Sequence, residues 1–159
     1  MKITILCVGK IKEKFYVDAI KEYSKRLGRY CKLDIVEVND EKTPAELSEN
    51  EMNIVKNKEA ERMSKYISEE AYVIALAIDG KKYSSEKFAS YIDKLGINGI
   101  SHIQFIIGGS LGLSDKILNR ADLKLSFSDM TFPHQLMRVI LLEQIYRCYR
   151  IINNEPYHK

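Results

Sequence analysis

At 159 residues, 45% of them hydrophobic and 30% charged, the chain is long enough to bury one hydrophobic core and has the composition of a globular protein. No apolar run approaches the roughly 20 residues that span a bilayer, and the apolar start is too short for a signal peptide, so we expect a cytoplasmic protein without a membrane segment. The three cysteines lack the spacing of a zinc site or a disulfide framework.

The predicted elements alternate between strand and helix along the whole chain. Each predicted strand is a nearly continuous apolar run, which is typical of strands buried on both faces, and each predicted helix has apolar residues at helical spacing. In chain order we expect a strand at 2–8, a helix at 16–27, a strand at 32–38, a helix at 45–66, a strand at 71–78, a helix at 85–95, a strand at 103–107, a helix at 113–120, a strand at 123–127 and a helix at 133–152.

Particular residues predict where some of these elements begin or end. Gly28 is expected to cap the C-terminus of the first helix, and Thr43-Pro44 to begin the second. Strands that alternate with helices predict a single α/β domain over residues 1–159 with a mostly parallel sheet.

Ligands of such sheets bind beyond the carboxyl ends of the strands. Three turns follow the predicted strands at that edge, at Asp79-Gly80, Gly108-Gly109 and Ser128–Met130. We therefore expect these turns to converge on one pocket.

The net charge of +3 conceals an uneven distribution of charged residues. Residues 1–32 contain nine lysines and arginines against three acids, whereas residues 33–70 contain eleven acids against five bases. A basic cluster of this kind can bind nucleic acid by displacing counterions from phosphates. It is equally compatible with a solvated helix face, so charge alone does not establish an RNA partner.

The glycine-rich run Gly108-Gly109-Ser110-Leu111-Gly112 matches neither the dinucleotide fingerprint nor the P-loop. Glycines allow a backbone to approach a flat ligand closely, and free N–H groups can bind an adenine edge or a carboxylate. A tight turn into the next helix explains the same residues, so the run does not identify a ligand by itself.

The three histidines, His102, His134 and His158, lack the spacing of metal ligands, and we expect no metal site. His134 follows Pro133 at a predicted helix start, where a capping role is expected. His158 lies beside Tyr157 in a polar tail beyond the last helix, and the ordinary fate of such a tail is to fray.

Four motifs in the last third occur in a specific order. They are Ile-Gly-Gly-Ser-x-Gly, then Leu-Ser-Phe-Ser-x-Met-Thr-Phe-Pro-His-Gln-Leu-Met-Arg-Val, then Leu-x-Glu-Gln-Ile-Tyr-Arg, and a terminal Pro-Tyr-His-Lys. With the Met-Lys-Ile-Thr-Ile start and Val8-Gly9-Lys10, they resemble the ribosomal RNA large-subunit methyltransferase H (RlmH) family of the SPOUT methyltransferases. The likeness covers essentially the whole chain.

This resemblance implies a SPOUT-type sandwich whose C-terminal helix is threaded through a loop as a trefoil knot, an exception to the unknotted norm. It also implies a homodimer that binds S-adenosylmethionine at the knotted region. Members of the family methylate N3 of a pseudouridine in large-subunit (23S) rRNA on the assembled ribosome, and that is the implied activity.

Carried over by motif, the resemblance implies that eight residues contact the methyl donor. These are Leu76, Gly108, Phe127, Ser128, Asp129, Met130, Thr131 and Phe132. Both loops would expose backbone N–H and C=O groups to the adenine and amino-acid ends of the donor. Arg138, Arg147 and Arg150 are expected to face RNA phosphate or the rim of the donor site, although each is also compatible with an ordinary surface arginine.

Tyr157 and His158 are the predicted catalytic residues. A histidine has a suitable unperturbed pKa to accept the N3 proton, and such a base contributes about 10²–10⁴-fold. The alternative is that both side chains only stack on the flipped base. The sequence leaves open whether the tail acts in its own chain or across the dimer.

A second class of function, a non-catalytic RNA-binding or ribosome-associated α/β module, also fits the pattern of elements.

Overall fold

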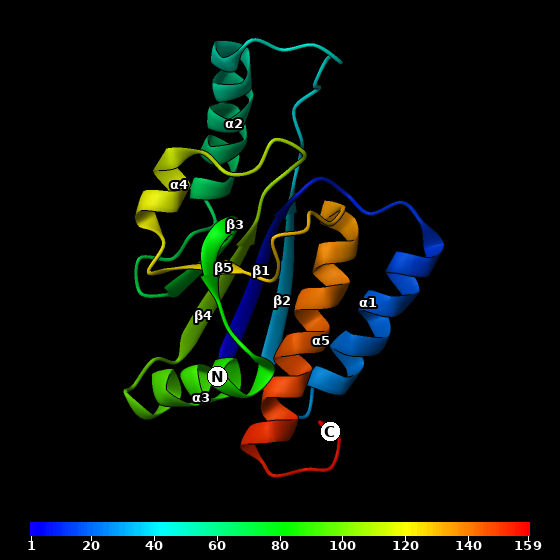
Figure 1. The fold of residues 1–159 in the computed structure, drawn as a ribbon, viewed down its shortest axis with the longest axis vertical. Coiled ribbons are helices and arrows are strands. Elements are labelled where there is room, and N and C mark those ends of the chain that lie inside the picture. The colour runs from blue at the N-terminus through cyan, green and yellow to red at the C-terminus, as the bar shows by residue number, and fades with distance from the viewer.

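The computed structural model describes all 159 residues and contains one five-stranded sheet with helices on both faces (Figure 1). The strand order is β2-β1-β4-β3-β5, and every neighbouring pair is parallel, which confirms the predicted α/β fold with a parallel sheet. In chain order the elements are β1 (Lys2–Val8), α1 (Lys14–Leu27), β2 (Lys32–Val38), α2 (Glu49–Ser64), β3 (Tyr72–Lys82), α3 (Ser85–Ile97), β4 (His102–Ile107), α4 (Asp115–Arg120), β5 (Leu123–Ser126) and α5 (His134–Ile152).

The sheet is apolar on both faces because successive side chains of a strand point to opposite sides. In β1, Ile3, Ile5 and Cys7 join the core beneath α1, α3 and α5, whereas Leu6 and Val8 join the core beneath α2 and α4. Cys7 is fully buried in the core, and burial raises the pKa of its thiol to about 12. No helix is both long and apolar enough to cross a membrane.

The predicted start of α2 at Thr43-Pro44 is wrong. The helix begins at Glu49, because the Ser48 side chain caps it and accepts a hydrogen bond of 3.2 Å from the Glu51 backbone N–H. Residues 39–47 are neither helix nor strand. Gly28 does cap α1, but in a right-handed conformation (φ −57°) that needs no glycine.

The predicted turn at Asp79-Gly80 is also wrong, because β3 continues to Lys82. Its pairing with β5 shifts between Leu76 and Lys81, both of which oppose Leu125, so the residues between them bulge from the ladder. Gly80 lies against the neighbouring strand, and a Cβ atom there would be 2.7 Å from the Lys124 carbonyl carbon. The bulge turns residues 77–79 toward the carboxyl edge of the sheet.

Residues 127–133 cross the carboxyl edge of the sheet between β5 and α5 (Figure 1). Beyond α5 the chain folds back, since Tyr157 donates a hydrogen bond to Glu143 within that helix. The trefoil knot that the resemblance implies stays a prediction.

Candidate functional site

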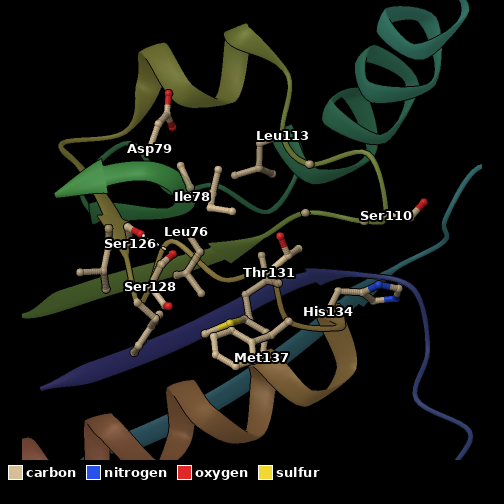
Figure 2. Close-up of a pocket in the computed structure, with 18 of the residues that line it drawn as sticks. Leu76, Ile78, Asp79, Ser110, Leu113, Ser126, Ser128, Thr131, His134 and Met137 are labelled. Carbon is tan, nitrogen blue, oxygen red and sulfur yellow. Dashed lines mark hydrogen bonds between the residues drawn. The ribbon is translucent and has the colours of Figure 1, made fainter. Parts of the chain in front are cut away.

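A cavity of about 650 Å³ opens at the carboxyl ends of β3, β4 and β5 (Figure 2). Small-molecule sites commonly enclose about 300–1,000 Å³, so the cavity has the size of a ligand site. Its walls come from four segments, from α4 and from the first turn of α5. The lining segments are Leu76–Asp79, Ile107–Leu113, Leu125–Ser128 and Met130–Phe132, joined by Leu118, His134 and Met137.

The glycine turn forms one wall of the cavity and depends on the missing side chain at Gly108. A Cβ atom at that position would lie 2.7 Å from the carbonyl carbon of Gly112, which is too close for any side chain. Gly112 has φ +85°, and its N–H donates to Gly109 at 3.0 Å, so the chain doubles back tightly. The shape of this wall therefore depends on glycine at position 108.

The loop after β5 forms a second wall and is fixed by its own serines. Ser126 donates to the carbonyl of Ser128 at 3.2 Å, and the Ser128 hydroxyl accepts from the Met130 N–H at 2.9 Å. All of the predicted donor-contact residues except Asp129 line the cavity. The Asp129 carboxylate pairs instead with Lys82 of β3 and is largely exposed.

The tail is not frayed but packed against α5. The Tyr157 hydroxyl donates to Glu143 at 2.9 Å, and the Arg147 guanidinium lies 4.6 Å from the centre of the Tyr157 ring. Burial and the nearby Glu143 carboxylate raise the pKa of Tyr157, so this side chain is a hydrogen-bond donor near neutral pH.

His158 is held at both ring nitrogens. Nδ1 lies 3.2 Å from Arg147, and Nε2 lies 2.7 Å from the Glu86 carboxylate at the start of α3. The structure thus brings the two predicted catalytic residues together, but neither of them lines the cavity of the same chain.

Arg138 was expected to face RNA phosphate or the rim of the donor site, but its side chain is buried within the protein. Its side chain is 3% exposed and forms an ion pair of 2.6 Å with Glu37, while Nη2 donates to the carbonyls of Val8 and Gly9. A guanidinium enclosed in this way cannot reach a phosphate. Its position on the second turn of α5, directed toward the sheet, explains the burial.

Arg147 and Arg150 are half-buried and bind the tail. Arg147 donates to Glu143 at 2.6 Å, and Arg150 pairs with Glu155 and donates to the Pro156 carbonyl at 3.0 Å. Any contact of these two arginines with RNA would be made at the tail rather than on an open basic surface. The partners Glu143 and Glu86 were not expected from the sequence, because only the folded-back tail makes them neighbours of Tyr157 and His158.

His134 is placed differently from the sequence-based expectation. It is the first residue of α5, and the cap position is Pro133, with no side-chain cap. His134 belongs instead to the residues that line the cavity, and Figure 2 shows its imidazole at one end, directed away from Thr131 and Met137. The expected capping role is therefore wrong.

Comparison with known proteins agrees with this fold. The family described as "Predicted SPOUT methyltransferase" matches residues 1–158. The chain is 65% identical to the ribosomal RNA large subunit methyltransferase H of Bifidobacterium adolescentis and 62% identical to that of Clostridium beijerinckii, in each case over all 159 residues and the full length of both proteins.

Two solved structures share the fold at low sequence identity. A putative methyltransferase from Legionella pneumophila, solved with the bound cofactor SAM, has a TM-score of 0.51 and 14% identity, covering 94% of this chain and 66% of that chain. A probable methylase family protein from Haemophilus influenzae has a TM-score of 0.52 and 12% identity, covering 96% of this chain and 66% of that chain. The chain belongs to the ribosomal RNA large-subunit methyltransferase H family of the SPOUT methyltransferases.

Proposed function

We propose that this protein transfers a methyl group from S-adenosylmethionine to N3 of a pseudouridine in large-subunit (23S) rRNA on the assembled ribosome, in the cytoplasm. The observation that carries the proposal is the convergence of Leu76, Gly108 and the segment after β5 on one cavity. These segments are far apart in the sequence and were expected to bind the donor on motif grounds alone. Large-subunit rRNA as the acceptor is supported by the names of the relatives, and N3 of a pseudouridine by the resemblance to the family.

The cavity fits the donor because its walls offer backbone groups and apolar surface. The Gly108 turn exposes main chain where any side chain would collide with Gly112, and a flat adenine ring needs that close approach. Phe127, Met130 and Phe132 supply apolar contact, while main-chain N–H and C=O groups can bind the polar edges. The donor supplies an electrophilic methyl carbon on a sulfonium.

The contribution of the protein is mainly to bind and align the two reactants. Holding reactants in attack geometry corresponds to about 7–11 kcal/mol of the barrier. A base that accepts the N3 proton adds about 10²–10⁴-fold. We assign the RNA-facing role to Tyr157 and His158, with Arg147 and Arg150 beside them as the groups available to phosphate.

A homodimer reconciles the position of the tail with that of the cavity. Within one chain, Glu143, Arg147 and Glu86 hold the tail, and neither Tyr157 nor His158 lines the cavity. We propose that the tail serves the cavity of a second copy. The exposed apolar side chains Ile78, Met130 and Phe132 at the cavity rim support an interface there, because such a cluster favours burial against another surface.

The decisive experiment is methyl transfer from labelled S-adenosylmethionine to intact ribosomes and to free rRNA, followed by mass mapping of the product. We expect transfer to one nucleotide of the large subunit, with ribosomes preferred over free rRNA. A calorimetric titration with S-adenosylmethionine accompanies it. A folded chain that binds RNA but not this donor would instead support the non-catalytic RNA-binding module.

The role of His158 is tested by the His158→Ala variant. If the variant loses a limb of the pH profile of kcat, the result supports a role of His158 in accepting the N3 proton. An unchanged pH profile combined with weaker RNA binding supports stacking on the base.

A further inference from the structure

The cavity has an end that the proposed donor contacts leave free. Figure 2 shows Leu76, Ser126 and Ser128 toward one end, and Ser110 and His134 toward the other. A transferase has to hold its acceptor beside the donor in attack geometry. Ser110 and His134 line this end, and neither is among the expected donor contacts.

His134 differs from the other two histidines in having no hydrogen-bond partner in the protein. His102 bonds to Thr4 at 2.9 Å, and His158 is bound at both ring nitrogens by Arg147 and Glu86. The Nε2 atom of His134 lies beside Gly9, where a Cβ atom would be 3.8 Å away. Both ring nitrogens of His134 thus remain available to a ligand.

The charged groups around His134 come from three segments. Arg138 lies one turn later on α5, Asp40 follows β2, and Glu13 precedes α1. Burial and the Arg138 guanidinium lower the pKa of His134 below its usual value of 6.5, against the opposing charges of Asp40 and Glu13. The imidazole is therefore neutral at pH values near 7 and can accept a proton.

We propose that His134 contacts the acceptor base at this end of the cavity and takes the proton from its imide N3. The inference rests on the proposed function and deepens it, because it assigns an acceptor-side residue to the chain that binds the donor. N3 forms a bond to the methyl carbon, the carbon–sulfur bond breaks, and its electron pair returns to sulfur. The N3 proton passes to a ring nitrogen of His134 and then to water. The tail then acts by stacking on the base.

The test compares His134→Gln with the matched control His102→Gln, whose imidazole lies at the opposite end of the sheet. With wild-type protein active on ribosomes, we expect His134→Gln to lower kcat by about 10²–10⁴-fold and to remove the acidic limb of its pH profile. Donor affinity by calorimetry should stay at the wild-type value. The His102→Gln variant should keep the wild-type kcat and pH profile. In the His158→Gln variant the acidic limb of the pH profile should also remain.

A binding readout makes the test independent of turnover. Imidazole resonances of His134 are followed by NMR while an RNA hairpin that contains the pseudouridine is added to donor-loaded protein. We expect them to shift, and to stay unshifted with a hairpin methylated at N3. The inference is overturned if the His134→Gln variant has the wild-type kcat and pH profile. It is also overturned if the hairpin shifts the resonances of other residues but not those of His134. Absence of methyl transfer by the wild-type protein overturns the proposed function itself.

Discussion

Arg138 and Glu37 form an ion pair, with 2.6 Å between Nη1 and Oε2, that fastens the second turn of α5 to the end of β2. Arg138 also donates to the carbonyls of Val8 and Gly9, and Glu37 accepts from the Ile11 N–H at 3.2 Å. One buried guanidinium thus joins the carboxyl ends of two strands to the helix that carries the cavity residues His134 and Met137.

Replacing Arg138 tests this role. Arg138→Ala leaves two carbonyls and a carboxylate without their donor, and we expect a loss of about 3 kcal/mol in the free energy of unfolding. The figure is at the low end for a buried pair because Glu37 is 34% exposed. Urea unfolding measures this loss in stability, and the Arg138→Lys variant is used for the same measurement if the alanine variant does not fold. A midpoint equal to that of wild type for both variants would contradict the assignment.

The glycine turn gives a prediction about donor binding. In Gly108→Ala the new methyl group would lie 2.7 Å from the Gly112 backbone, so the turn has to open and the donor should no longer bind. The control is Gly96→Ala within α3, where the nearest atom is 3.6 Å away and a gain of about 0.5–1 kcal/mol in stability is expected. Calorimetry with S-adenosylmethionine distinguishes the two variants, and equal affinities would refute the prediction.

The exposed rim predicts the oligomeric state. Met130 is 76% exposed beside the cavity, and Met130→Asp should place a charge in the proposed dimer interface. We expect this variant to sediment as a monomer and to lose methyl transfer. Ile97→Asp, at a position 75% exposed at the end of α3, should sediment as wild type. A wild-type protein that is already monomeric at micromolar concentration would rule out the dimer.

Glu59 makes stability depend on pH. Burial raises the pKa of this carboxyl above its usual 4.5, and the charges of Asp40 and Glu41 add to the effect, so the folded state disfavours the ionised form. Its contribution to stability is present below that usual pKa and is lost as pH rises through the raised one.

The Glu59→Gln variant keeps an acceptor for the Glu41 N–H, which lies 3.0 Å from the carboxylate, and removes the charge. We therefore expect a higher urea midpoint than wild type near pH 8, with no difference near pH 4. Glu61→Gln, at an exposed position of α2, should show no gain at either pH. A Glu59→Gln variant with no gain near pH 8 would contradict the prediction.

Local patterns predicted the elements wherever one local signal dominated. β1 begins and ends where its apolar run does, because a buried strand admits few polar side chains. The start of α2 was misplaced because two capping signals competed, and the Ser48 cap prevailed over Pro44. The end of β3 was misplaced because Gly80 serves a close approach to β5, which no local pattern reveals.

Local sequence patterns were sufficient to predict the alternation of strands and helices, the edge of the sheet that carries the cavity, and the motifs of the family. These depend on side-chain periodicity and on glycines at fixed positions, which are local properties of the chain. The folded arrangement was needed to show that Arg138 is enclosed, that the tail is held by Glu143 and Glu86, and that His134 lines the cavity. Each of these depends on contacts between distant segments, whose burial and hydrogen bonding arise only when the helices pack onto the sheet.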